Sequence, residues 1–441
     1  MFERSFRTRF FVSCPQKMAD QRTPLVCFWF RRDLRADDNH AFFQALSSGW
    51  SVLPIYIIDD DIRLPIRYEA LRTLRSKGVP IRIYTGRPSA VFNELLQTHT
   101  IRAVYANVDR EPQALKRDKE VQDLLQQRDV AFHTYVDRVL FDAEAVLKSD
   151  GKPYTVFTPY ANAWKKRLQS EGIPHYPSES LLQHAYDAFL PDFPDASSLG
   201  ISSHKPICTV PVWTEQQCAA YAQTRDYPAL DATSHWGAGL SLGMVSPRAL
   251  IRFAQQHSTV WLNELIWREF FQSILAHFPH VEHKAFKPAY DWIDWRNDEA
   301  AFEKWCSGTT GIPLVDAGMR QLNQTGWMHN RVRMITAGFL VKHLLIDWRL
   351  GEAYFAQKLL DYELASNNGN WQWAAGSGCD AAPYFRVFNP LLQAKKFDPH
   401  SDYIRKWLPE WGSPDYPLPL LDLNEGRDRA IRTYKKALSA V

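Results

Sequence analysis

The sequence predicts two domains of different class: an α/β domain built on a doubly wound, Rossmann-like parallel sheet, followed by an all-α domain. Three observations predict this. Short apolar runs alternate with helical patterns from Leu25 to about Leu140, strand patterns stop after about residue 211, and 441 residues exceed what one core usually holds. We therefore expect a disordered N-terminal extension over 1–24, the α/β domain over 25–140, an interdomain linker over 141–210 and the helical domain over 211–441.

The strands of the first domain are expected in runs rich in β-branched and aromatic residues. Helical patterns with apolar residues three and four apart separate these runs, as in βαβ units. No Gly-x-Gly-x-x-Gly or P-loop pattern follows any of them, which argues against a standard dinucleotide or nucleoside triphosphate site. The predicted strands are 25–30, 51–58, 81–86, 103–108 and 131–136, and the predicted helices are 41–49, 68–78, 90–99 and 111–128.

Composition narrows the class of protein. The formal charge is +3, too small for a polybasic nucleic-acid binder, so any DNA binding requires a local patch. No apolar run is long enough to cross a bilayer, and we expect no membrane partner. The six cysteines are scattered without metal-ligand spacing, which predicts a reducing compartment and no metal site.

Residues 262–278 predict a helix with one apolar face and one face of mixed aromatic and charged residues. Leu262, Leu265, Ile266, Phe270 and Ile274 recur at helical spacing and predict its buried face. The remaining rows mix two indoles, a carboxylate and a guanidinium, which favours a binding wall over an ordinary solvated surface. These rows carry Trp261, Glu264, Trp267, Arg268 and Phe271.

Two further segments are dense in functional residue types. Segment 364–390 packs tandem Asn, two Trp and several Gly together, which predicts a cofactor pocket with close backbone approach to a flat polar ligand. Segment 325–349 predicts a helix with Val332, Ile335, Phe339 and Leu340 buried. The arginines at its start could hold phosphates or pair with carboxylates such as Asp361, and both interpretations stay open.

At this point five ordered motifs carry a resemblance: 29–39 (WFRRDLRADDN), 152–168 (KPYTVFTPYANAWKKRL), 263–270 (NELIWREF), 325–349 and 365–390. In this order they resemble the photolyase/cryptochrome family, and most closely its class I cyclobutane pyrimidine dimer photolyases. The resemblance runs from Leu25 to about Pro409. It implies an antenna role for the α/β domain, FAD in the helical domain, and light-driven electron transfer from reduced FAD to dimers in DNA.

The resemblance also implies which residues hold FAD. Loop 232–243 would lie along the flavin phosphates, where backbone N–H groups and hydroxyls can approach a pyrophosphate. Gly237 stands where the family usually has serine, and Trp236 is also atypical. Arg333 would pair with Asp361 near the flavin, and Asn367 would face flavin N5, as an amide can donate and accept. The implied FAD-binding residues are Tyr221, Thr233, Ser234, His235, Trp236, Gly237, Asn330, Arg333, Asp361, Glu363 and Asn367.

Repair and electron transfer are carried over in the same way. Trp371, Trp348 and Trp295 match the family's three-tryptophan chain, which passes electrons from the surface to oxidised flavin. Glu264 would donate a hydrogen bond to the dimer, a role that needs its protonated form. Trp267 and Trp373 would form the aromatic walls of the dimer pocket, and the implied DNA-contacting residues also include Arg225, Trp261, Arg268, Asn330, Arg331, Met334 and Gln393.

Alternatives remain within the same family. A cryptochrome photosensor would bind FAD without repair, but plant-type cryptochromes have an acid at the position of Asn367. Enzymes that repair the 6-4 photoproduct have two histidines where this chain has Asn330 and Met334, and methionine cannot transfer a proton. We further expect a monomer, located in the cytoplasm with the nucleoid if the host is bacterial. An antenna chromophore, methenyltetrahydrofolate or a deazaflavin, is implied but not assignable, because the connection from Ile58 to Gly78 is shorter than in the family.

Overall fold

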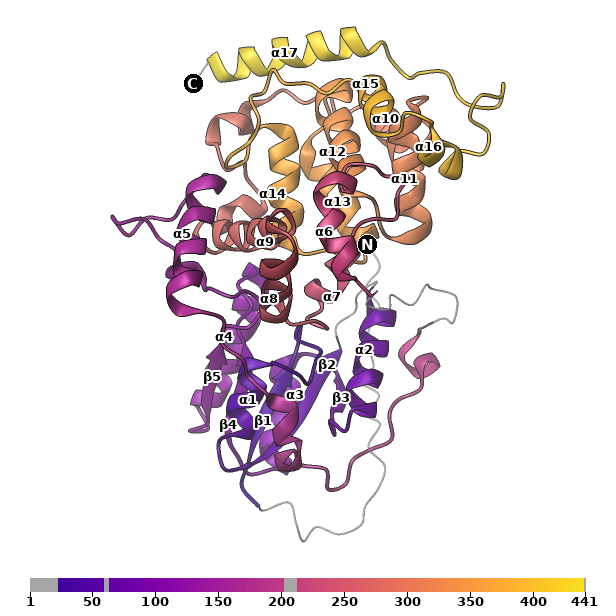
Figure 1. Ribbon diagram of the computed structural model, residues 1–441. Coiled ribbons are helices and arrows are strands. Elements are labelled where there is room, and N and C mark those ends of the chain that lie inside the picture. Colours follow the sequence, from indigo (N-terminus) through magenta and orange to yellow (C-terminus); the bar gives the residue numbers. More distant parts are fainter. Residues whose placement is uncertain (1–22, 59–62, 202–211, 440–441) are drawn as a thin grey trace. The chain divides into compact units, whose positions relative to one another are not determined.

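The computed structural model describes residues 23–58, 63–201 and 212–439 (Figure 1). The predicted extension over 1–24 therefore lies outside the described residues except for Thr23 and Pro24. The chain divides into two compact units. One comprises Met1–Arg138, His175–Ile207 and Leu242–Ser246, and the other comprises Val139–Pro174, Cys208–Ser241 and Pro247–Val441.

The first unit is the predicted parallel α/β sheet, with strand order β3-β2-β1-β4-β5. All four neighbouring pairs are parallel. Alternate residues of β1 enter opposite cores, because Val26 and Phe28 pack with α1 and α2, whereas Cys27 and Trp29 pack with α3 and α4. The elements are β1 (Leu25–Phe30), α1 (His40–Leu46), β2 (Ser51–Ile58), α2 (Leu64–Ser76), β3 (Arg82–Thr85), α3 (Pro88–Thr98), β4 (Ile101–Asn107), α4 (Pro112–Gln126) and β5 (Ala131–Tyr135).

Polar side chains at the carboxyl ends of β1 and β4 bind one another. The Asn107 amide donates to Asp33 at 2.6 Å and to Asn39 at 2.8 Å, and Arg35 pairs with Asp137 at 2.6 Å. The order of the strands reverses between β1 and β4, which is where open parallel sheets usually bind ligands. Here these buried groups bind one another, with Arg35 Nε left without a partner, and they stabilise the turns that follow the strands.

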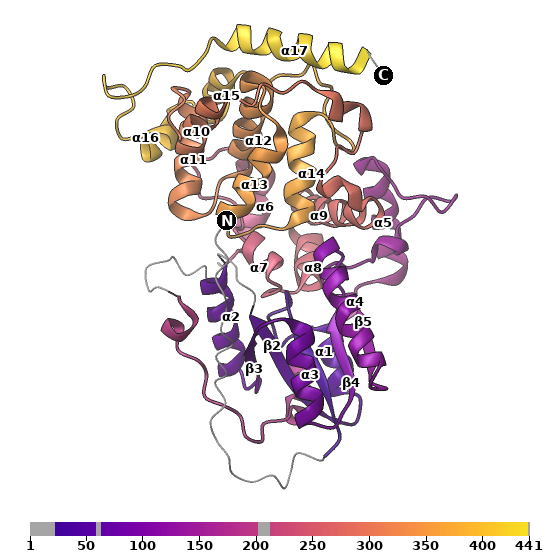
Figure 2. The ribbon, with the colours of Figure 1, turned by 180° about the vertical axis from the view of Figure 1, so that it is seen from behind.

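The second unit is helical. Figure 2 shows α9, α12 and α14 in this unit, with the sheet in the other. Among its described residues the α-helices are α5 (Phe157–Glu171), α6 (Glu215–Thr224), α7 (Gly237–Ser241), α8 (Pro247–His257), α9 (Thr259–His277), α10 (Glu299–Ser307), α11 (Pro313–Thr325), α12 (Asn330–Gly338), α13 (Trp348–Lys358), α14 (Leu364–Ala375), α15 (Pro390–Phe397), α16 (Asp402–Trp407) and α17 (Leu423–Ser439).

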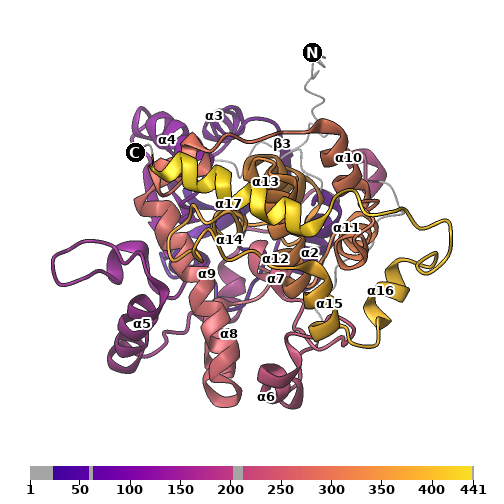
Figure 3. The same ribbon diagram turned by 90° about the horizontal axis from the view of Figure 1, so that it is seen from above.

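Short helical turns complete both units. In the helical unit, α12 continues into a π-helix, η6 (Phe339–Leu344), and α17 packs on η6 and on the 3₁₀-helix η5 (Pro288–Trp292). Figure 3 shows α17 in yellow, lying across the other helices of its unit. The remaining 3₁₀-helices are η1 (Ala143–Ala145), η2 (Ser178–His184), η3 (Ala196–Leu199) and η4 (Pro279–Glu282).

The structure differs from the prediction of a plain linker over 141–210. Residues up to Pro174 belong to the helical unit and include α5, where Tyr160, Ala161, Trp164 and Leu168 are buried. Residues from His175 to Ile207 belong to the α/β unit. The many prolines of this stretch suggested an open connection, but the apolar face of α5 is stabilised by packing on α9.

Two helix crossings of the second unit depend on glycine. A Cβ on Gly369 of α14 would lie 2.2 Å from the ring of Phe271 on α9, and one on Gly351 of α13 would lie 2.2 Å from the indole of Trp371 on α14. Both glycines therefore let an aromatic ring pack directly against a helix backbone. As a result, α14 is held between α9 and α13 at the level of the candidate site.

None of the described helices is long and apolar enough to span a bilayer.

Candidate active site

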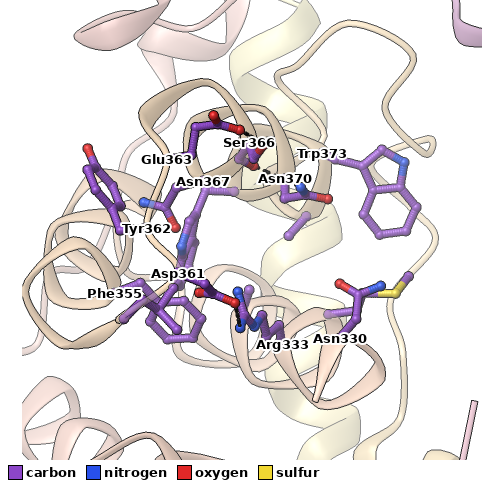
Figure 4. Close-up of a pocket in the computed structure, with 15 residues that line it drawn as sticks. Asn330, Arg333, Phe355, Asp361, Tyr362, Glu363, Ser366, Asn367, Asn370 and Trp373 are labelled. Atoms are coloured by element: carbon purple, nitrogen blue, oxygen red, sulfur yellow. Dashed lines mark hydrogen bonds and ion pairs between the residues drawn. The ribbon is translucent and has the colours of Figure 1, made fainter. Parts of the chain in front are cut away.

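A pocket opens in the helical unit between α12, α13 and α14, and its empty space of about 590 Å³ includes the solvent at its mouth (Figure 4). Side chains from the two dense segments of the sequence meet there although they are about thirty residues apart in the chain. The predicted site residues that line it are Asn330, Arg333, Met334, Asp361, Glu363, Asn367, Trp371 and Trp373.

Segment 364–390 forms the pocket differently from the prediction. We expected a glycine-rich backbone approach, but residues Leu364–Ala375 form helix α14, and the pocket is lined by its side chains. Ser366, Asn367, Asn370, Trp371 and Trp373 line it at helical spacing. The tandem Asn and several Gly of this segment had suggested that the backbone itself would approach the ligand. Tertiary packing on α9 and α13 outweighs these weak helix formers.

Arg333 and Asp361 form the ion pair that the sequence suggested. Arg333 Nη2 lies 2.7 Å from Asp361 Oδ2, and Arg333 Nε donates to the backbone oxygen of Met328 at 2.8 Å. Figure 4 shows this pair on the wall of the pocket. The other oxygen of Asp361, Oδ1, is buried without a hydrogen-bond partner. An unpaired buried carboxylate oxygen is costly, so this atom is suited to a donor group of a bound ligand.

Gly237 lies against the same carboxylate. A Cβ at Gly237 would be 2.9 Å from both Cβ and Oδ2 of Asp361. The glycine that replaces the family's usual serine therefore leaves room for Asp361. Its neighbour His235 has a positive φ of 52°, pairs with Asp231 at 2.8 Å and lies 4.1 Å from the ring of Trp327.

Asn367 is held from outside the pocket. Its Nδ2 donates to the backbone oxygen of Glu352 at 3.1 Å, and the residue is nearly buried. Burial raises the pKa of the Glu352 carboxyl to about 7, and its Oε1 has no hydrogen-bond partner. The amide of Asn367 therefore has a defined orientation before any ligand binds.

His329 caps the helix that carries the arginines, a role that the sequence analysis missed. Its Nδ1 accepts from the backbone N–H of Arg331 at 3.1 Å. Burial, together with the charges of Arg333 and Arg331, lowers its pKa to about 4. The ring is therefore neutral near pH 7, as an acceptor at Nδ1 requires. The sequence offered little signal for this cap, because the usual N-cap residues are Ser, Thr, Asp and Asn.

A second group of predicted residues lies along α6, α9 and α12. Arg225 Nη1 lies 2.5 Å from Glu264 Oε1, and Arg331 Nη2 lies 2.6 Å from Asp226 Oδ1. The Arg225 guanidinium also lies over the ring of Tyr221, 5.2 Å from its centroid. Asp226 was absent from the sequence predictions, although it directly follows Arg225.

Three residues of the α9 wall differ from the expectation of an open binding face. Trp261 is only 4% exposed, among the rings of Trp213 and Trp236, and Phe271 is buried against Gly369. Arg268 pairs with Glu363 at 2.7 Å instead of pointing outward. The mixed face of this helix therefore includes core positions, because a helix surrounded by α5, α8 and α14 buries more than one stripe.

The two predicted aromatic walls are not equivalent. Trp373 lines the pocket. Trp267 is stacked face to face on Phe157 of α5, with centroids 3.6 Å apart and planes 4° apart. Trp267 is not one of the described residues that line the pocket. Phe157 was not predicted, and nothing in the sequence pattern marks it as the partner of Trp267.

The other predicted residues are placed in the core or at the surface. Trp371 and Trp348 are buried in one core cluster, on which the half-buried Trp295 packs. Tyr434 of α17 lies against Trp295, with ring centroids 5.9 Å apart. Gln393 is partly exposed on α15, and Tyr221, Thr233 and Ser234 are also partly exposed.

Comparisons with known proteins agree with this arrangement. Residues 26–178 match the DNA photolyase family, and residues 261–414 match the FAD binding domain of DNA photolyase. Two relatives named deoxyribodipyrimidine photo-lyase, from Escherichia coli and Vibrio cholerae, are each 36% identical over 93% of this chain and cover 98% and 99% of their own lengths.

Solved structures give the same result. A bacterial class III photolyase from Agrobacterium tumefaciens is similar with a TM-score of 0.82 and 32% identity, over 95% of this chain and 98% of that one. A cryptochrome from Synechocystis has a TM-score of 0.80 at 26% identity, over 93% of this chain and 99% of that one. By fold, site and sequence, this chain belongs to the DNA photolyase family.

Proposed function

We propose that this protein is a light-dependent lyase that splits cyclobutane pyrimidine dimers in DNA with FAD as its cofactor. The observation that carries the proposal is the single pocket in which Asn367, Trp373, Met334 and the Arg333–Asp361 pair come together. These residues come from two helices, α12 and α14, and from the turn that precedes α14, and they share no local sequence pattern. Their convergence is explained by one ligand in contact with all of them.

The residues of the pocket fit FAD. The buried Asp361 Oδ1 is an acceptor without a partner, suited to a hydroxyl or N–H donor of the cofactor. Asn330, Asn367 and Asn370 add amides that can donate and accept. Arg333 holds the Asp361 carboxylate in place, and Asn367 would face flavin N5. Reduced FAD, when bound and excited by light, supplies the electron that opens the cyclobutane ring.

The chain's own residues would receive the lesion beside the cofactor. A dimer must leave the DNA helix to reach the pocket, and its poor stacking lowers that cost. Trp373 and Met334 would contact the flipped bases, with Trp267 as the second aromatic wall. Glu264 would donate a hydrogen bond to the dimer, while Arg225 and Arg331 would contact phosphates.

Three tryptophans of the helical unit would return an oxidised cofactor to its reduced form. Trp371 lines the pocket, and Trp348 and Trp295 belong to the same core cluster. The first two are buried and lie in that cluster among apolar side chains. We propose that these three residues carry electrons to the pocket when the bound cofactor is oxidised.

We further propose that the protein acts as a monomer and, if the host is bacterial, that it is located in the cytoplasm with the nucleoid. Four described cysteines, Cys27, Cys218, Cys306 and Cys379, are free, which fits a reducing compartment. The DNA substrate fits the same location. Light scattering of the FAD-loaded protein with and without DNA tests the oligomeric state.

One assay tests the function. The FAD-loaded protein is photoreduced and then illuminated with DNA that carries either a cyclobutane dimer or a 6-4 photoproduct, and restored bases are counted. We expect restoration of the cyclobutane dimer alone. Restoration of the 6-4 photoproduct would instead support that repair class, and FAD binding without any restoration would support a cryptochrome-type sensor.

A further inference from the structure

Four charged side chains form a continuous chain of alternating sign at the edge of the candidate site. Glu264 of α9 binds Arg225 at 2.5 Å, Arg225 Nε lies 4.0 Å from Asp226 Oδ1, and Asp226 binds Arg331 of α12 at 2.6 Å. The two arginines are predicted to contact DNA and Glu264 to contact the dimer. Asp226 has no role in those predictions, although it joins the two halves of the chain.

The two arginines of this row of four charged side chains are accessible to a phosphate. The side chains of Arg225 and Arg331 are 26% and 19% exposed. A guanidinium binds phosphate best through two parallel N–H donors, which requires it to turn toward the phosphate. Arg225 now gives Nη1 to Glu264 and is stacked over Tyr221. Because Glu264 holds Nη1, a phosphate that takes this nitrogen competes with Glu264 for the guanidinium.

The charge state of Glu264 depends on this competition. Burial raises its pKa, the bound Arg225 lowers it, and the negative charge of Asp226 raises it. If Arg225 leaves, the one stabilising cation is lost while burial and Asp226 remain, and both favour the protonated acid. Tyr221 also lies close to Glu264, and burial raises its pKa to a value at which it stays neutral near pH 7.

Other charged groups around α9 have partners elsewhere and do not replace Arg225. Glu269 of α9 is buried and accepts from the backbone N–H of Leu140 at 2.5 Å and from the indole of Trp164 at 2.6 Å. The other groups form separate ion pairs with distances between 2.7 and 3.9 Å. These pairs are Arg268 with Glu363 ahead of α14, Arg167 with Glu171 in α5, His257 of α8 with Glu215, His277 with Glu144 of η1, and His283 with Glu282 of η4.

We propose that Arg225 is a positioning residue that exchanges Glu264 for a DNA phosphate, and that Glu264 takes up one proton from solvent in this exchange. The proton goes to the released carboxylate, and the guanidinium stays charged throughout. The new O–H of Glu264 can then donate to a carbonyl of the dimer. Asp226 holds Arg331 and keeps a negative charge beside Glu264. This inference rests on the proposed function, because it assumes that dimer-containing DNA is the ligand.

Calorimetry measures the proton directly. FAD-loaded protein is titrated in the dark with dimer-containing DNA near pH 7, in buffers of different ionisation enthalpy. We expect uptake of up to one proton per complex in the unchanged protein, and loss of this uptake in both Glu264→Gln and Arg225→Gln. In the second variant Glu264 already lacks its cation before DNA binds, so binding changes little at the carboxyl group.

Arg331→Gln is the matched control. It removes a guanidinium of the same chain that binds Asp226 and not Glu264. We expect it to weaken DNA binding while retaining the proton uptake. Uptake that survives in Arg225→Gln, or that disappears equally in Arg331→Gln, would contradict the exchange.

An infrared measurement on the unchanged protein is independent of variants that fold poorly. A carboxylic-acid C=O band should appear when the dark complex forms, and Glu264→Gln should lack it. These measurements distinguish a failure of the proposed exchange from a failure of the proposed function. A protein that restores dimers under light but binds them without proton uptake or a new band overturns the exchange alone, whereas a protein that neither prefers nor restores dimers overturns the function.

Discussion

At the scale of single residues, the site is defined by polar groups that the protein leaves partly unsatisfied. Asp361 has one oxygen paired with Arg333 and one buried without a partner. Glu264 is paired with an arginine that is itself partly exposed. Such groups are expensive in a stable core and are retained where a ligand completes their hydrogen bonds.

Glu264→Ala should lower repair much more than binding. The change removes the hydrogen bond to the dimer but also releases Arg225, which becomes available to phosphate. We expect the efficiency of repair by prereduced protein to fall about tenfold, and the dissociation constant for dimer DNA to change less than about threefold. Flash-illumination yields and binding isotherms on the same samples check this. Equal losses in both would contradict the assigned role.

His329 should make stability depend on pH. Its folded pKa of about 4 lies below the usual 6.5, so the unfolded chain binds more protons between these values. The contribution of His329 to the free energy of unfolding should therefore be at its maximum above pH 6.5. It should decrease as the pH drops toward 4, by up to about 3 kcal/mol. His329→Asn keeps an N-cap acceptor without a titrating ring and should flatten this dependence in denaturant titrations. An unchanged slope in this variant would assign the effect to another group.

At the scale of elements, the position of α14 determines the pocket. This helix presents Asn367, Trp371 and Trp373 to the pocket. The ring of Phe271 packs on its backbone at Gly369, and its own Trp371 packs on Gly351 of α13. Close crossings at Gly351 and Gly369 leave little freedom for the helix to rotate or slide. The orientation of Asn367 is therefore set by packing at residues that touch no ligand.

Gly369→Ala should destabilise the helical unit. The new methyl group would lie 2.2 Å from the Phe271 ring, so α14 or α9 must move. We expect a loss of about 1–3 kcal/mol in the free energy of unfolding and weaker retention of FAD. Gly338→Ala is the control, because the nearest atom to its Cβ would be 3.9 Å away on Phe388. Thermal unfolding and flavin absorbance distinguish the two, and similar behaviour of both variants would disprove the packing argument.

At the scale of the whole molecule, each of the two units has its own hydrophobic core. Asn107, Asp33, Asn39 and the Arg35–Asp137 pair bind one another at the sheet switch point of the α/β unit, whereas the pocket of the helical unit has a buried acceptor without a partner, Asp361 Oδ1. The helical unit also contains the tryptophan cluster around the pocket. Both the proposed repair chemistry and the proposed electron supply therefore belong to this unit.

Trp348→Phe should separate these two activities. Photoreduction of oxidised FAD should slow by about tenfold or more, because phenylalanine is much harder to oxidise than an indole, while repair by chemically prereduced protein should stay nearly unchanged. Trp305→Phe is the control, because Trp305 is equally buried and its ring centroid lies 6.1 Å from that of Trp371, but it is outside the predicted chain. Transient absorption and repair yields measure the two effects. A Trp348 variant that also lost repair when prereduced would refute the assignment.

The sequence by itself determined the parallel sheet, the helical second half and most of the pocket residues. Periodicity of apolar residues reports which side of an element is buried, and the ordered motifs reported the family. Tertiary structure decided that 364–375 is a helix, that Trp261 is core, that Phe157 covers Trp267, and that Asp226 links Arg225 with Arg331. These outcomes depend on which helices cross and how closely. Contacts between residues distant in the chain leave no periodic trace in the sequence, so only the packed fold decides them.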